Sequence, residues 1–116
     1  MYREDLSPCR VIPVELESTA HSIGWLDQNY PFPTGETPRK FGSILRRLAK
    51  DIKNTMWGFH ECEFCEGKRY QGAGEIHVVG PDGAIYVAPQ LIVHYIETHN
   101  YLPPQEFIDA VLSNDR

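Results

Sequence analysis

The chain has 116 residues, of which 41% are hydrophobic and 23% are charged. This is the composition of an ordinary globular protein, and the length fits a single domain over residues 1–116, because single domains cluster near about 100–150 residues. The formal net charge of −5 disfavours nucleic acid as a partner, because the overall field repels phosphate.

The N-terminus and the cysteines indicate the compartment. Nowhere do about 18 apolar residues run together, and residues 1–8 lack the apolar core of a signal peptide. We therefore expect a cytoplasmic protein with no membrane contact. Three cysteines are an odd number, which argues against a disulfide framework in such a chain and favours metal binding or redox chemistry.

Two short strands are predicted in the first quarter of the chain. Residues 9–17 alternate apolar and polar side chains, and Pro13 suggests an edge strand or a bulge because proline cannot donate a ladder hydrogen bond. Residues 22–27 form a second apolar piece, which we expect to be a strand that packs Trp25 into the core.

A helix is predicted over residues 38–52. Thr37 would cap it and Pro38 would be its first residue, where the missing N–H of proline is not needed. Apolar residues recur at three- and four-residue steps and face the core. The opposite, basic face is interpreted as solvated, although it could make a local anionic contact. Its basic residues are Arg39, Lys40, Arg46, Arg47, Lys50 and Lys53.

The second half of the chain predicts a hairpin and two helices. Asp82 and Gly83 supply the positive φ that a hairpin loop needs between two apolar runs, so we expect a hairpin over residues 75–88. One helix should follow over residues 89–99 and another at the C-terminus. The fold class is therefore α+β, a small antiparallel sheet packed against the helix at 38–52 and two C-terminal helices.

The residues between these elements predict a metal site. Cys62 and Cys65 have the Cys-x-x-Cys spacing that lets two sulfurs converge on one ion, and Gly67 lets the backbone turn away. A hairpin and a helix carrying His94 and His99 follow, which resembles the element order of treble-clef zinc sites. We predict that Zn²⁺ is held by these two cysteines and two histidines in a closed, structural site.

Two features leave the ligand set open. On an ideal helix His94 and His99 lie roughly 140° apart, so the helix end must unwind slightly for both to bind. His60 could replace either histidine, or could complete a three-ligand site with Cys62 and Cys65 and leave water in the fourth position. An open site of that kind would be catalytic. Its candidate general bases would be Glu61, Glu63, Glu66 and Glu75.

Plainer interpretations exist for the same residues. Cys62 and Cys65 could be a redox pair, although nothing around them resembles the strand and helix of a thioredoxin. His94 could be a core histidine bonded to backbone, and His77 is expected to be structural or solvent-facing. Cys9 has no partner at motif spacing and is expected to be a buried small apolar residue.

Several stretches resemble a family of small uncharacterised bacterial proteins. GFHECEFC occupies residues 58–65 and LIVHYIETHNYLPP occupies residues 91–104, and the shorter stretches 5–8, 24–27 and 74–76 extend the likeness over most of the chain. The resemblance implies a compact bacterial single-domain protein in which the cysteine turn and the two-histidine helix belong together. It implies no activity.

We expect a non-enzymatic protein-interaction or regulatory module in which the metal is structural. An acidic, aromatic-rich surface would meet another protein, and one version is an immunity-type partner of a basic protein, which the net charge suits. Aromatic residues in predicted loops could be interface anchors or could anchor the loops themselves. They are Tyr30, Phe32, Trp57 and Phe64.

Two alternative functions remain. One is a metal-dependent hydrolase with an open zinc site at His60, Cys62 and Cys65, in which His94 or His99 acts as acid or oxyanion stabiliser. The other is a nucleic-acid module that uses the basic helix face, and its binding would fall steeply with salt. Four protein ligands would indicate a scaffold, whereas three ligands and a water would favour the enzyme.

Overall fold

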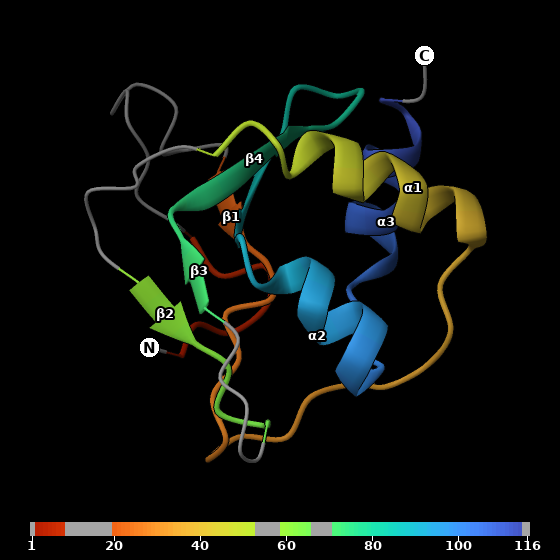
Figure 1. The fold of residues 1–116 in the computed structure, drawn as a ribbon. Helices are drawn as coiled ribbons and strands as arrows, with labels where there is room; N and C mark the ends of the chain where they lie inside the picture. Colours follow the sequence, from red (N-terminus) through yellow and green to blue (C-terminus); the bar gives the residue numbers. More distant parts are fainter. Residues whose placement is uncertain (1, 9–19, 53–58, 66–70, 115–116) are drawn as a thin grey trace.

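The protein was analysed as a computed structural model that describes residues 2–8, 20–52, 59–65 and 71–114. Figure 1 shows strands on one side of the molecule and helices on the other. The described part of the chain has a three-stranded mixed sheet, a two-stranded sheet and three helices, so the predicted α+β class is confirmed.

The three-stranded sheet has the order β1-β5-β4, formed by β1 Ala20–Ser22, β5 Ile85–Pro89 and β4 Glu75–Val79. β4 and β5 pair antiparallel as the predicted hairpin, with Gly83 at φ 88° in the loop, and that prediction is confirmed. β1 pairs parallel with β5, so the sheet is mixed rather than antiparallel. The long connection between these two strands contains a helix, which is the kind of crossover that parallel pairing needs.

The strand predicted over residues 22–27 is wrong beyond Ser22. Gly24 adopts φ 75°, outside the range of an extended strand, and a side chain there would lie 3.0 Å from Ile92. Trp25 is nevertheless buried and donates its Nε1–H to the carbonyl of Val87, so its predicted packing into the core is confirmed. The strand predicted over residues 9–17 lies outside the described residues.

Helix α1 extends over Arg39–Leu48 and is shorter than the predicted 38–52. Pro38, at ψ 143°, is the residue that precedes the helix and no side chain caps it, so Thr37 is not the N-cap. The predicted apolar stripe is buried at Phe41, Ile44 and Leu45. The helix therefore buries the face that the periodicity indicated.

Helices α2 Ile92–His99 and α3 Gln105–Leu112 confirm the two C-terminal helices. Phe107 of α3 is fully buried and contacts the rings of Phe41 and Tyr86 edge to face, which joins α3 to α1 and to the sheet. None of the helices in the described residues has the length and apolar character needed to cross a membrane.

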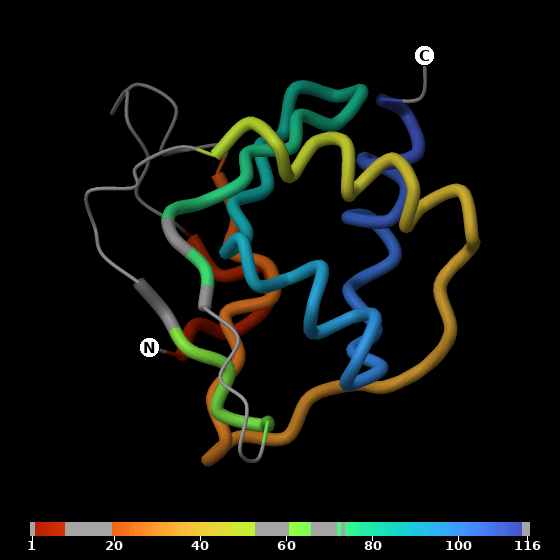
Figure 2. The backbone as a smooth tube through the Cα atoms, viewed as in Figure 1, coloured from red at the N-terminus to blue at the C-terminus, as the bar shows by residue number. Residues whose placement is uncertain are grey.

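The second sheet pairs β2 Phe59–Glu61 antiparallel with β3 Gln71–Ala73. Figure 2 shows the segment after β1 running below this sheet and past the C-terminal end of α2 before it reaches α1. Along this path Leu102 N–H donates to the carbonyl of Pro33, and Gly35 N–H donates to the carbonyl of Asn100. These bonds fix the end of α2 beside the loop that precedes α1.

Candidate metal centre

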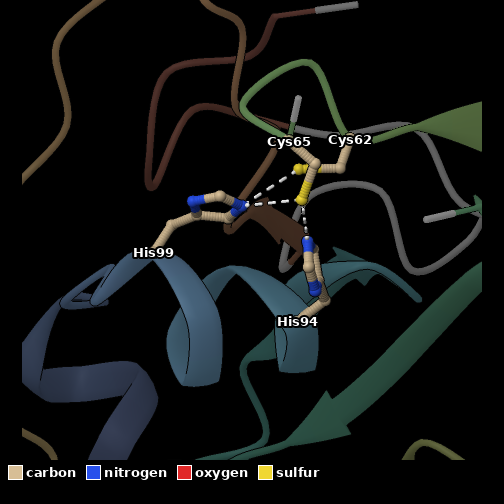
Figure 3. A group of neighbouring side chains, drawn as sticks. All are labelled: Cys62, Cys65, His94 and His99. Atoms are coloured by element: carbon tan, nitrogen blue, oxygen red, sulfur yellow. Dashed lines mark hydrogen bonds between the residues drawn. The ribbon is translucent and has the colours of Figure 1, made fainter. Parts of the chain in front are cut away.

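Two cysteines and two histidines from separate segments meet at one point of the molecule. Cys62 and Cys65 lie in the turn that follows β2, and His94 and His99 lie on α2 (Figure 3). One ligand atom from each residue lies within 4.8 Å of the corresponding atoms of the other three. Both cysteines are free thiols, Cys62 buried and Cys65 half-buried. The structure thus contains a Cys₂His₂ group that could hold a metal ion.

Three sulfur–nitrogen distances within this group are close to those of a tetrahedral coordination shell. Cys65 Sγ lies 3.2 Å from His94 Nε2 and 3.3 Å from His99 Nε2, and Cys62 Sγ lies 3.3 Å from His99 Nε2. A zinc ion with bonds of about 2.3 Å to sulfur and about 2.0 Å to nitrogen would separate these atoms by roughly 3.5 Å. Each of the three pairs is therefore within a few tenths of an ångström of that separation.

The end of α2 accounts for the approach of two histidines that are five residues apart. His99 is the last helical residue, and Asn100 follows at φ 59° in the left-handed conformation. Its N–H donates to the carbonyl of Tyr95, five residues earlier, and Tyr101 N–H donates to the same carbonyl. A turn closed by a five-residue bond is wider than an α-helical turn, which brings His99 closer to the face of His94.

Thr98 positions one of the candidate ligands. Its hydroxyl lies 3.2 Å from His94 Nδ1, which leaves Nε2 of the same ring directed at Cys65. A hydrogen bond at one ring nitrogen fixes the tautomer and the orientation of a histidine that binds metal through the other nitrogen. Thr98 is four residues after His94, on the same helix face, so the spacing alone could have indicated it; we did not predict it.

Phe64 fastens the cysteine turn to α2. Its ring packs edge to face against Tyr95 at a centroid distance of 6.0 Å and lies 5.5 Å from the ring of His99. Phe32, from the loop after β1, also packs edge to face against Phe64, at a centroid distance of 5.2 Å. The apolar contacts therefore hold the turn against the helix independently of any ion.

The pKa values of two of these groups are shifted by their surroundings. Burial, more than any other cause, raises the pKa of the Cys62 thiol. Burial, and next the positive charge that His99 can carry, lower the pKa of His94. A low histidine pKa favours the neutral imidazole that can ligate a metal, whereas a bound cation is needed to favour the Cys62 thiolate.

Those of the predicted general bases whose side chains the structure describes are not part of this group. His60 is in β2, but its side chain lies outside the described part of the structure, and so do Glu66 and Cys9. Glu63 accepts a hydrogen bond from Gln28 N–H, and Glu61 is exposed. Glu75 is buried on β4, where it contacts His77 Nε2 at 2.8 Å.

Comparison with known proteins adds a family but no activity. Residues 1–112 match the model of a family described as a domain of unknown function, DUF7919. The chain belongs to this family. The match covers both the cysteine turn and α2, which agrees with the resemblance of most of the chain to a family without an assigned activity. No curated protein and no solved structure matches the chain.

Proposed function

We propose that this protein is a small zinc-binding module in which Cys62, Cys65, His94 and His99 hold one structural Zn²⁺. The observation that carries the proposal is the convergence of four ligand atoms within 4.8 Å. Two segments 29 residues or more apart in the sequence supply them, so an ion would tie the cysteine turn to α2. A closed set of four protein ligands leaves no coordination position for substrate.

The ligand chemistry supports zinc over other metals. Two thiolates and two imidazoles in a near-tetrahedral arrangement are a common structural zinc set, whereas Mg²⁺ and Ca²⁺ prefer oxygen ligands. With Nε2 of His94 on the metal, its Nδ1–H donates to the Thr98 hydroxyl, which is the outer contact that such sites ordinarily have. A structural ion of this kind contributes to the free energy of folding.

The role that fits a closed site is a protein-interaction or regulatory module. The net charge of −5 suits a basic partner, including the immunity-type pairing considered above. Tyr30, in the loop after β1, exposes 48% of its surface, and tyrosine is enriched at the anchor positions of protein interfaces. Phe32 and Phe64 instead pack against each other, so we assign them to stabilising the loops and not to anchoring a partner.

Metal content of the purified protein tests the zinc site directly. We expect about one zinc per chain by inductively coupled plasma mass spectrometry, as one four-ligand site requires. Cys62→Ser, His94→Ala and His99→Ala should each lose most of the zinc and melt at a lower temperature. His60→Ala is the matched histidine control and should retain both zinc and melting temperature.

The same variants distinguish the closed site from the alternative of an open, catalytic site. Zinc that is lost with His60 but survives the double change of His94 and His99 would contradict the closed site and support the hydrolase. Preparations without any metal, including after expression with added zinc, would contradict both sites.

A further inference from the structure

A stacked pair of tyrosines stands on the surface next to the cysteine turn. The rings of Tyr2 and Tyr30 lie 3.9 Å apart between centroids with an interplanar angle of 11°. Tyr30 and Val79 are the large hydrophobic residues that the described part of the chain leaves most exposed, at 48% and 52%. A flat, double aromatic plate of this kind offers an accessible π-face with little side-chain freedom left to lose.

Hydrogen bonds within the protein fix the loop that carries Tyr30 in the absence of a partner. Tyr30 N–H donates to the carbonyl of Asp27, and Asn29 N–H donates to the carboxylate of the same residue. Gln28 N–H donates to Glu63 Oε1, so the loop is bonded to one of the two residues between the cysteines of the turn. The position of Tyr30 thus depends on the cysteine turn, and any ion bound there would fix it further.

Near the tyrosine pair in the sequence, the three carboxylates of Glu4, Asp5 and Asp27 outnumber the one cation, Arg3, whose guanidinium lies over Trp25. Glu4 is exposed two residues after Tyr2, and Asp27 begins the loop of Tyr30. Desolvation, and next the negative charges of Glu4 and Asp5, raise the pKa of Tyr2. A cation is therefore favoured at this surface and an anion is not.

We propose that the Tyr2–Tyr30 pair and the adjacent carboxylate of Glu4 dock a basic protein segment through an arginine side chain. A guanidinium is planar, so it can stack on an aromatic face while its N–H groups reach a carboxylate, which an ammonium cannot do as well. The chain already contains one contact of this type, since the Arg3 guanidinium lies 4.4 Å from the Trp25 ring centroid. This inference names the partner chemistry of the proposed interaction module and rests on that proposed function.

The test compares two fluorescent peptides by anisotropy with zinc-loaded protein. One peptide carries arginines in a glycine-serine background, and the other carries lysines at the same positions. Wild-type protein should bind the arginine peptide roughly two- to fivefold more tightly, within the range that an exposed cation–π contact contributes. Tyr30→Ala should remove this preference, and Glu4→Gln should weaken the binding of both peptides.

Matched controls separate the proposed surface from general charge and apolar effects. Val79→Ala truncates the other strongly exposed hydrophobic side chain, and Glu36→Gln removes an exposed carboxylate from the segment before α1. Neither variant should change the arginine preference. A preference that survives Tyr30→Ala, or is lost equally in Val79→Ala, overturns the docking surface.

Zinc content and melting temperature of every sample distinguish this inference from the proposed function. Protein that carries one zinc but binds both peptides equally overturns the docking surface alone. Protein that carries no zinc yet still prefers arginine, with the preference removed by Tyr30→Ala, overturns the zinc site and supports the docking surface.

Discussion

At the scale of single residues, the candidate metal centre depends on groups beyond the four ligands. His94 Nε2 is directed at Cys65 because its other nitrogen contacts the Thr98 hydroxyl, and His99 lies against the Phe64 ring. These contacts set the orientation of both imidazoles before an ion binds. Because the rings are already oriented, the entropic cost of ordering them when an ion binds is smaller.

Thr98→Val tests this orientation. The substitution keeps the shape of the side chain and removes the hydroxyl, so the ring of His94 loses its partner at Nδ1. We expect zinc affinity to fall by about tenfold, the lower end of the effect of outer contacts in metal sites. Competition with a chromogenic chelator measures the affinity. Thr98→Ser retains the hydroxyl and should bind zinc like the wild type; an equal loss in both variants would mean that packing, not the hydrogen bond, is responsible.

At the scale of elements, two glycines have opposite roles. Gly42 lies within α1, and a Cβ added there would meet no atom within 4 Å. Gly24, after β1, has φ 75° and would place a Cβ 3.0 Å from Ile92. Packing within the described structure therefore does not require glycine at position 42. At position 24 glycine is required both by the positive φ and by the closeness of Ile92.

Gly42→Ala should stabilise the protein by about 0.5–1 kcal/mol, because alanine loses less backbone entropy in a helix than glycine does. Gly24→Ala should destabilise it, since alanine there is strained in the left-handed conformation and must displace Ile92. Urea unfolding of the two variants beside the wild type measures both free energies. If Gly42→Ala destabilised the protein, the space beside Gly42 would not be free as the structure shows it.

At the scale of the whole molecule, the candidate centre joins parts that the chain keeps separate. The cysteine turn belongs to the β2–β3 sheet, and the histidines belong to the helix that follows the β4–β5 hairpin. Phe64 already packs the cysteine turn against α2, and an ion at this point would add a further tie between the two parts. Metal binding is then linked to the stability of the whole fold.

Chelation and acid should both act through this tie. Removal of zinc should lower the melting temperature, and the zinc-dependent increment should disappear as pH falls below about 6.5, because protons displace the metal from histidine. The lowered pKa of His94 works in the same direction without metal: the unfolded state takes up the proton first, so stability falls as pH drops through the unfolded pKa. Melts from pH 5 to pH 8, with and without chelator, check this; an increment independent of pH would contradict ligation by the histidines.

Local features determined much of this protein from sequence alone. The Asp82-Gly83 pair predicts the hairpin because only a few residues accept its positive φ, and the apolar steps around Phe41 predict the buried face of α1. The Cys-x-x-Cys spacing and the histidines at positions 94 and 99 predict a metal site, because ligand chemistry is a property of residue type. That these residues bind zinc stays a prediction.

The tertiary structure alone decided how these parts meet. Sequence periodicity carries no information on which distant strands pair, so the parallel pairing of β1 with β5 was not predicted. The spacing of His94 and His99 required the helix end to unwind, but only the structure shows how it does so, through a left-handed Asn100 and a widened last turn. The Tyr2–Tyr30 stack joins residues that no local pattern connects. Local propensity acts over a few neighbouring residues, whereas the convergence of ligands and the surface beside them depend on contacts between residues far apart in the chain.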